Sequence, residues 1–168
     1  MERLWTPWRL AYVSGGESTG CVFCNALTDA DAAPLILFRG ATCFVILNLF
    51  PYNNAHLMVV PNRHVGSLAE ATHEELSDLI LLTRTAEIAI TEAYAPHGMN
   101  IGINLGKPAG AGVPGHLHLH VVPRWNGDTN FLTVVGHTRV LPEELPQTAE
   151  RLRPIFERLS RHFPRPER

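Results

Sequence analysis

The sequence predicts an α+β fold, because strand-like segments cluster along the chain and helical segments occur singly among them. Three observations support this prediction: five short segments rich in β-branched and aromatic residues, one long segment with helical periodicity, and an amphipathic segment near the C-terminus. No internal repeat and no linker divides the 168 residues. A chain of this length usually forms one domain with a substantial core. We therefore expect a single domain over residues 1–168.

Five segments are expected to form the sheet, at residues 34–39, 42–48, 56–61, 99–106 and 116–124. The first two are separated by Gly40 and have the composition of a β-hairpin. Pro61 closes the third, because proline cannot donate to a strand ladder. A glycine-rich loop joins the fourth segment to the fifth, which places these two strands side by side.

Two helices are expected. Thr72 and Glu75 have the spacing of a capping box, and apolar residues follow at helical intervals, so a helix should run from Thr72 to about Tyr94. A C-terminal helix is expected over residues 141–163, where leucine, isoleucine and phenylalanine recur on one helical stripe. Residues 1–20 have no periodicity, and we expect an irregular N-terminal arm that packs through Trp5 and Trp8.

Composition restricts the class of function. Hydrophobic residues make up 45% of the chain and charged residues 18%, which is typical of a globular protein. A net charge of −2 argues against binding long nucleic acid through many phosphate contacts. The sequence has no run of about 18 apolar residues and no signal-like apolar segment at Met1, so we expect no membrane span and a cytoplasmic location. Three cysteines do not suggest a disulfide framework.

The segment HLHLHVVPR places His116, His118 and His120 at every second position. In a strand, alternate side chains share one face, so the three imidazoles would lie roughly 7 Å apart along that face. Three interpretations are open: a polar surface face, a metal site built on an H-x-H pair, or nucleophilic catalysis at phosphorus. Imidazole suits the last role, because much of it is unprotonated at neutral pH.

The loop GKPAGAGVPG directly before this segment favours phosphorus chemistry. Its glycines, among them Gly110 and Gly112, let backbone N–H groups approach anionic oxygens closely, and Lys107 adds a positive charge. Glycine richness alone is also compatible with a flexible connection. Its position beside three histidines strengthens the phosphate-binding interpretation.

Cys21 and Cys24 form a C-x-x-C pair. In a cytoplasmic protein such a pair can be two small buried residues. It is also the usual first half of a four-ligand zinc site, which needs two further ligands. Cys43 lies within an expected strand and is read as a core residue.

These motifs together resemble the histidine triad (HIT) superfamily of nucleotide hydrolases and transferases. HLHLHVV matches the superfamily signature, and VILNLFPYNNAHLMVVPNRH resembles its ribose-binding region. RLWTPWRLAYV, PHGMNIGINLGKPAGAG and HVVPRWNGDTNF resemble the branch of bacterial diadenosine tetraphosphate phosphorylases and fragile histidine triad relatives. The resemblance covers most of residues 3–136. It implies a HIT-like antiparallel sheet of about five strands, continued across a homodimer, with the helix of residues 72–94 in the contact.

The resemblance also implies catalytic roles. His118 would be the nucleophile that attacks the α-phosphorus and forms a nucleotidyl-histidine intermediate. His120 would contact the phosphate and help to protonate the departing group. His56, on the earlier strand, would support the triad, with His116 as its first member.

Nucleotide contacts and metal ligands follow from the same alignment of motifs. Asn48 matches the ribose contact and Asn104 a phosphate contact, while Gly110, Gly112 and Trp125 lie in the loop and rim of the pocket. Gly112 occupies the place of a glutamine in fragile histidine triad hydrolases, which leaves the phosphate contact there to the backbone. Many superfamily members bind zinc through four residues that correspond here to Cys21, Cys24, His64 and His116.

We therefore predict an enzyme that cleaves a nucleoside polyphosphate, in particular a diadenosine polyphosphate, with a structural Zn²⁺ and no organic cofactor. Water as acceptor would make it a hydrolase, and inorganic phosphate would make it a phosphorylase. Two alternatives remain: a zinc metalloenzyme that uses the H-x-H pair, and a non-catalytic nucleotide-binding regulator. Partners other than the nucleotide, the acceptor and a second copy of the chain are not expected.

Overall fold

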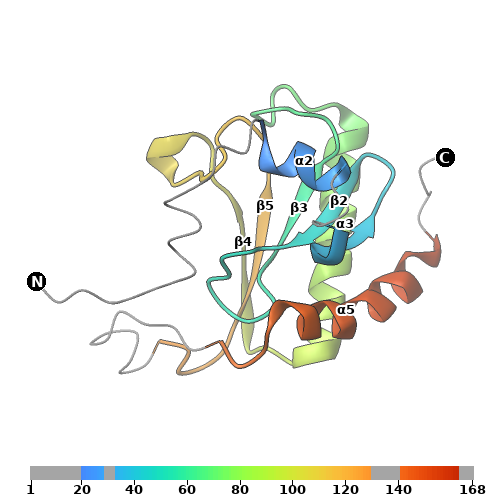
Figure 1. Ribbon diagram of the computed structural model, residues 1–168, viewed down its shortest axis with the longest axis vertical. Coiled ribbons are helices and arrows are strands. Elements are labelled where there is room, and N and C mark those ends of the chain that lie inside the picture. The colour runs from blue at the N-terminus through green and yellow to red at the C-terminus, as the bar shows by residue number, and fades with distance from the viewer. Residues whose placement is uncertain (1–19, 29–32, 130–140, 163–168) are drawn as a thin grey trace, which may run out of the picture.

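The computed structural model describes residues 20–28, 33–129 and 141–162. These form one five-stranded sheet in the order β1-β2-β3-β5-β4, and every neighbouring pair is antiparallel (Figure 1). The strands are β1 (Ile36–Arg39), β2 (Cys43–Leu47), β3 (Leu57–Pro61), β4 (Gly98–Ile103) and β5 (Leu119–Arg124). The helices are α2 (Val22–Thr28), α3 (His73–Tyr94) and α5 (Leu145–Leu159), with 3₁₀ turns at Ala33–Leu35, Lys107–Ala109 and Ser160–His162. The predicted α+β class with a five-stranded antiparallel sheet is confirmed.

The start of β5 differs from the prediction. The strand begins at Leu119, not at His116, because Leu117 donates its backbone N–H to Val65 O (2.6 Å) in the loop after β3. The alternation of side chains nevertheless holds in front of the strand. Leu117 and Leu119 lie in one core cluster, and His118 between them contacts Phe23 on the other side of the sheet.

Two helical segments also differ. α2 was not predicted, and it makes Cys24, which lies just after the predicted arm of residues 1–20, a helical residue. The predicted arm and its two tryptophans otherwise lie outside the described residues. The C-terminal helix is shorter than the predicted range of residues 141–163, because it begins after Glu144. The backbone N–H of Glu144 donates to the Gln147 side chain as part of a capping box.

α3 follows the prediction at both ends. Glu75 N–H donates to Thr72 Oγ1 (3.2 Å), and Thr72 N–H donates to Glu75 Oε2 (2.8 Å), which completes the capping box. The helix ends at Tyr94, and Ala95 follows in the left-handed region with φ 43°. Among the described residues, no helix combines the length and apolar character needed to cross a bilayer.

The central part of the sheet is covered on both faces, whereas β4 at its edge is largely exposed. On the first, here called the helix face, α3 and α5 pack over alternate residues of the strands, including Val45, Leu57, Val59 and Val121. The opposite face, here called the histidine face, carries the intervening residues and is covered by α2. Its buried apolar residues are Phe23, Ala26, Ile36, Phe44, Ile46, Met58 and Val60. Because both faces are covered, β2 and β3 are buried at every position.

Candidate active site and metal-binding cluster

Three of the predicted catalytic histidines form a compact row on the histidine face. His118 is 4% exposed and His56 is fully buried, while His120 is partly exposed. The ring centroids of His118 and His120 lie 5.0 Å apart, and those of His120 and His56 lie 5.1 Å apart. His120 is held on β5 between Met58 of β3 and Gly102 of β4. The structure therefore brings His56, from the loop before β3, into contact with His120 on β5.

Hydrogen bonds determine where the protons of this row lie. The backbone N–H of Tyr52 donates to His56 Nδ1 (3.0 Å), so the proton of a neutral His56 is on Nε2. That Nε2–H faces His120 Nδ1 at 2.9 Å, which must accept it. A neutral His120 consequently carries its own proton on Nε2. The Tyr52 amide thus directs one N–H of His120 away from His56.

Both imidazoles are held in the neutral state. Burial lowers the pKa of His56 from 6.5 to about 3, and the neighbouring His120 and His118 add to this effect. Burial also lowers the pKa of His120 to about 4, with a contribution from His118. At neutral pH these two residues can donate and accept hydrogen bonds, but they do not carry a fixed positive charge.

His118 has a different hydrogen bond. Its Nδ1 lies 2.7 Å from the carbonyl oxygen of His116, which can only accept, so Nδ1 carries the proton. The lone pair of a neutral His118 is therefore on Nε2. One side of the ring packs against Phe23, with centroids 5.1 Å apart. An oriented imidazole with an available Nε2 lone pair is the arrangement that nucleophilic attack requires.

The segment between β2 and β3 supplies the predicted ribose contact. Asn48 Nδ2 lies 3.3 Å from His56 Nδ1, and its Oδ1 accepts from the Phe50 N–H (3.0 Å). Asn53, which the sequence analysis did not single out, fixes this loop. Its buried Nδ2 donates to Pro123 O (3.0 Å) and to Asp128 Oδ2 (2.8 Å). Arg124 binds the same carboxylate through Nε and Nη2, which holds the pKa of Asp128 well below its usual range.

The glycine-rich loop places Gly110 next to Asn104. Gly110 has φ +93°, a left-handed conformation that favours glycine, and a Cβ there would lie 3.7 Å from Asn104 Nδ2. Gly110 and Gly112 are exposed, and Asn104 is half-buried. Trp125 is half-buried at the other end of β5, where its backbone N–H approaches Asp128 Oδ2 at 3.4 Å.

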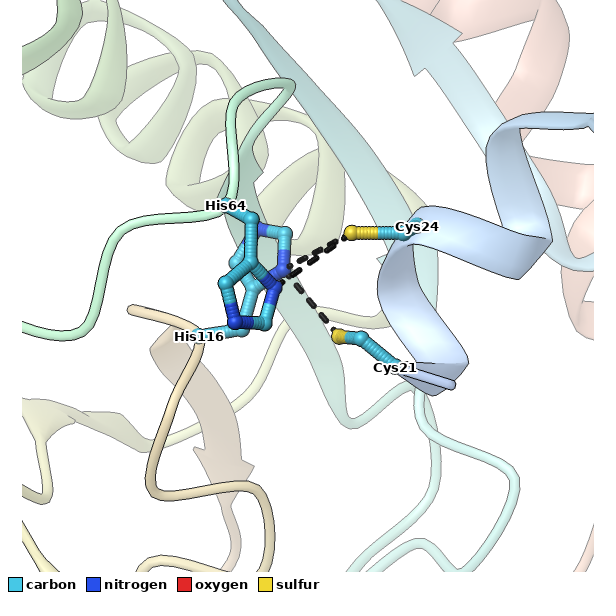
Figure 2. Close-up of side chains that lie close together, drawn as sticks. All are labelled: Cys21, Cys24, His64 and His116. Atoms are coloured by element: carbon cyan, nitrogen blue, oxygen red, sulfur yellow. Dashed lines mark hydrogen bonds between the residues drawn. The ribbon is translucent and has the colours of Figure 1, made fainter. Parts of the chain in front are cut away.

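The four predicted metal ligands come together at the other end of the histidine face. Figure 2 shows Cys21 and Cys24 at α2 facing the imidazoles of His64, from the loop after β3, and His116, from the segment before β5. Their ligand atoms all lie within 4.8 Å of one another. The Sγ–Nδ1 distances are 3.2 Å for Cys21–His116, 3.4 Å for Cys24–His64 and 3.6 Å for Cys24–His116. This cluster has the composition and geometry to bind a metal ion.

The donor set fits tetrahedral zinc. Zn–S bonds of about 2.3 Å and Zn–N bonds of about 2.0–2.1 Å place S and N ligands about 3.5 Å apart in a tetrahedron. His116 Nε2 lies 2.9 Å from Pro61 O and donates to it, which leaves the Nδ1 lone pair directed at the sulfurs. Burial and the neighbouring Cys21 raise the pKa of the Cys24 thiol, so a pair of thiolates here requires a cation to offset its charge.

Comparison with known proteins identifies the family. The model of the HIT domain matches residues 32–127. The chain belongs to the HIT family. It is 40% identical over 157 residues to the AP-4-A phosphorylase of Mycobacterium tuberculosis. This match covers 88% of this chain and 80% of that protein. It is 34% identical over 93 residues to the asymmetrical bis(5'-nucleosyl)-tetraphosphatase of Schizosaccharomyces pombe, over 55% of this chain and 50% of that protein.

A solved HIT structure supports both the fold and the cluster. The crystal structure of a zinc-bound histidine triad family protein from Mycobacterium smegmatis is 30% identical, with a TM-score of 0.68. The match covers 85% of this chain and 97% of that one. The predicted membership of the family is confirmed, and its curated relatives named above are nucleotide-cleaving enzymes.

Sequence reasoning missed three residues of this HIT site: Phe23, Tyr52 and Asn53. Phe23 lies inside the C-x-x-C pair, and the position of a large apolar residue between two candidate ligands was the available signal. Tyr52 packs against His56 and His120, with ring centroids 4.6 Å and 6.0 Å away. Its backbone N–H bonds to His56 only four residues away. The Asn53 side chain instead acts through Pro123 and Asp128, which are distant in the chain, and no local pattern encodes that contact.

Proposed function

We propose that this protein cleaves a nucleoside polyphosphate, in particular a diadenosine tetraphosphate, through a nucleotidyl-histidine intermediate on His118. One observation carries this proposal: the hydrogen bond from His118 Nδ1 to the His116 carbonyl, which leaves Nε2 as the nucleophilic atom. The 40% identity to an AP-4-A phosphorylase supports the choice of substrate. The oriented imidazole of His118 argues against the non-catalytic alternative, because a regulator does not need an oriented nucleophile.

In the first step His118 Nε2 attacks the α-phosphorus, and the bond to the bridging oxygen breaks. The electron pair leaves with the nucleoside polyphosphate, and the bonded imidazole becomes cationic while its Nδ1–H stays on the His116 carbonyl. His120 directs Nε2–H outward and stabilises the departing oxygen by a hydrogen bond, because a neutral imidazole does not readily give up that proton. In the second step the acceptor attacks the same phosphorus and releases His118.

We assign nucleotide binding to the residues around this row. Asn48 would hold the ribose, Asn104 and the backbone at Gly110 and Gly112 the phosphates, and Trp125 the rim of the pocket. His56 supports His120 through the bond between their rings. Both ring nitrogens of His116 are already engaged, so its part in catalysis is to fix the segment that carries His118.

The test is turnover of diadenosine tetraphosphate with and without inorganic phosphate, with the products resolved. Phosphate-dependent formation of ATP and ADP identifies a phosphorylase, and cleavage without phosphate identifies a hydrolase. His118→Ala should abolish turnover and the covalent nucleotidyl-enzyme detected by intact mass, with nucleotide affinity within about tenfold of wild type. His73→Ala, at an exposed position on α3, is the matched control. Turnover by His118→Ala above a few per cent of wild type would exclude His118 as the nucleophile.

We propose that the metal of the cysteine–histidine cluster is one structural Zn²⁺ per chain. Four protein ligands close a tetrahedral shell and leave no position for a reactive water. Thiolate ligands also require reduced cysteines, which agrees with a cytoplasmic location. Metal analysis should give about one zinc per chain in wild type. In Cys21→Ser/Cys24→Ser we expect zinc loss and a lower Tm. Complete loss of catalysis on zinc removal, in protein that keeps a wild-type circular dichroism spectrum, would favour the metalloenzyme alternative.

We propose a homodimer in which the sheet continues across β4. β4 ends the sheet among the described strands, and its Ile101 is 46% exposed. On α3, Ile80 is 60% exposed and Leu81 40% exposed, which adds apolar surface for the same contact. Light scattering should give twice the chain mass of 18.6 kDa at micromolar concentration, and Ile101→Lys should reduce it to the monomer. A monomer mass for wild type would refute the dimer.

A further inference from the structure

Phe23 connects the metal-binding cluster to the proposed nucleophile. It lies between Cys21 and Cys24 in the sequence, and its side chain is 5% exposed on the histidine face. Its ring contacts the imidazoles of both His116 and His118, with centroids 5.4 Å and 5.1 Å apart. One aromatic ring therefore contacts both a metal ligand and the residue that would attack phosphorus.

We propose that Phe23 is a positioning residue, which holds the imidazole of His118 in the orientation that presents Nε2 to the substrate. The metal-binding cluster fixes α2, and Phe23 on α2 thereby fixes the position of the His118 imidazole. This inference deepens the proposed function and rests on it, because His118 must be the nucleophile for its orientation to matter.

The orientation of His118 depends on few contacts. A half-turn about the bond between Cβ and the ring would exchange Nδ1 with a carbon and break the 2.7 Å bond to the His116 carbonyl. The described ring contacts of His118 are Phe23 on α2, tilted by 43°, and His120 on β5, inclined by 79°. His120 is occupied in the hydrogen bond with His56. Phe23 is thus the apolar surface that opposes rotation of the His118 ring.

Phe23 in turn depends on how α2 is anchored. A helix of seven residues is too short to be stable alone. Cys21 precedes its first residue and Cys24 lies in its first turn, and Figure 2 shows both side chains directed at the two histidines. On the sheet, Phe23 packs with Phe44, Ile46 and Met58. The helix is therefore fixed from two sides, and Phe23 lies at the junction.

The test compares Phe23→Leu with Ile36→Ala. Leucine keeps an apolar side chain but removes the planar surface against His118. Ile36 belongs to the same apolar cluster but lies on β1, three strands away from β5, so its truncation costs burial without touching the histidine row. Because displacement by about 1 Å in an active site can reduce the rate a hundredfold, we expect kcat for Phe23→Leu to fall about ten- to a hundredfold. KM should stay within about threefold of wild type. Ile36→Ala should retain kcat.

A second readout reports the orientation itself. The ¹⁵N chemical shifts of His118 should show a proton on Nδ1 alone in wild type and in Ile36→Ala, and a mixture of the two tautomers in Phe23→Leu. Metal content should stay at the wild-type value in all three proteins. If Phe23→Leu does not fold or loses metal, Phe23→Met, which keeps more of the volume, replaces it with the same expectations.

Wild-type kcat and a single His118 tautomer in the metal-loaded variant would overturn the inference. A purely structural role for Phe23 would lower Tm in both variants and leave the kcat and the tautomer of the folded protein unchanged. Failure of the proposed function is distinguishable, because wild type would then form no nucleotidyl-enzyme. The tautomer measurement still tests whether Phe23 orients His118 in that case.

Discussion

The two faces of the sheet are stabilised in different ways. The helix face is covered by helices of 22 and 15 residues over a cluster of nineteen buried side chains among the described residues. The histidine face has a helix of seven residues over a cluster of seven. Its smaller apolar cluster is supplemented by directed polar links: the cysteine–histidine cluster and the bond between His56 and His120. The comparison teaches that the face that carries the chemistry replaces apolar area with directed bonds.

Metal removal should separate the two faces most strongly. Structural zinc sites contribute apparent binding free energies of about 10–16 kcal/mol in zinc-finger peptides, so chelation should release α2 while the larger core persists. We expect amide hydrogen exchange in α2 to approach the rate of an open chain, and exchange in α3 to stay near wild type. Readdition of zinc should restore protection. Unchanged protection of α2 after complete metal removal would show that the apolar cluster holds this helix without help.

Truncation of a side chain in the larger core should lower the stability of the whole protein and leave the histidine face intact. Phe156 on α5 is fully buried and stacks on Phe38, with ring centroids 6.4 Å apart. Phe156→Ala should lower the free energy of unfolding by about 3–5 kcal/mol, measured by urea denaturation. The molecules that remain folded should keep wild-type kcat, because the helix face does not contact the histidine row. A fall in kcat at temperatures where the variant is fully folded would mean that the faces are coupled.

Acidification should weaken the histidine face. The pKa of His56 is about 3 and that of His120 about 4 in the folded protein, against 6.5 for an ordinary histidine. Below 6.5 the unfolded chain takes up protons that the folded protein excludes, so this stability is complete above 6.5 and is lost as the pH falls toward 4. Between pH 6.5 and about 4.5 we expect a loss of about 1–2 kcal/mol, allowing for solvent screening. His120→Asn should show a smaller loss over this range, and an identical pH dependence would contradict the assignment.

The smallest effect concerns two alanines with left-handed backbone. Ala95, after α3, has φ 43° and is exposed, whereas Ala55, before His56, has φ 57° and is buried in the core of the helix face. Ala95→Gly should relieve backbone strain and stabilise the protein by up to about 1 kcal/mol. Ala55→Gly loses a buried methyl group as well, so its net gain should be smaller. Thermal denaturation of the two variants measures the difference, and the reverse order would contradict this account.

Local signals predicted the parts of the molecule that are locally determined. The Thr72–Glu75 capping box located the start of α3, and the strand-like segments located all five strands of the sheet. The H-x-H-x-H pattern and the family motifs identified the histidine row and the four residues of the metal cluster, which the structure brings together.

Tertiary contacts decide what the sequence did not reveal. α2 has no cap signature, and its anchors are residues that are 40 and 92 positions away from Cys24 in the chain. β5 begins late because Leu117 bonds to the loop after β3. The role of Asn53 depends on Asp128, which becomes its neighbour only when the sheet has formed.

The hydrogen bond that sets the proton on His56 comes from the main chain of Tyr52, not from a side chain. Every amino acid except proline supplies the same N–H group at that position. Side-chain replacements at Tyr52 thus preserve this donor as long as the loop keeps its course, and so they preserve the direction in which His120 presents its own N–H. A conventional alanine scan of the loop would report on the tyrosine ring and would pass over the group that decides where the protons lie.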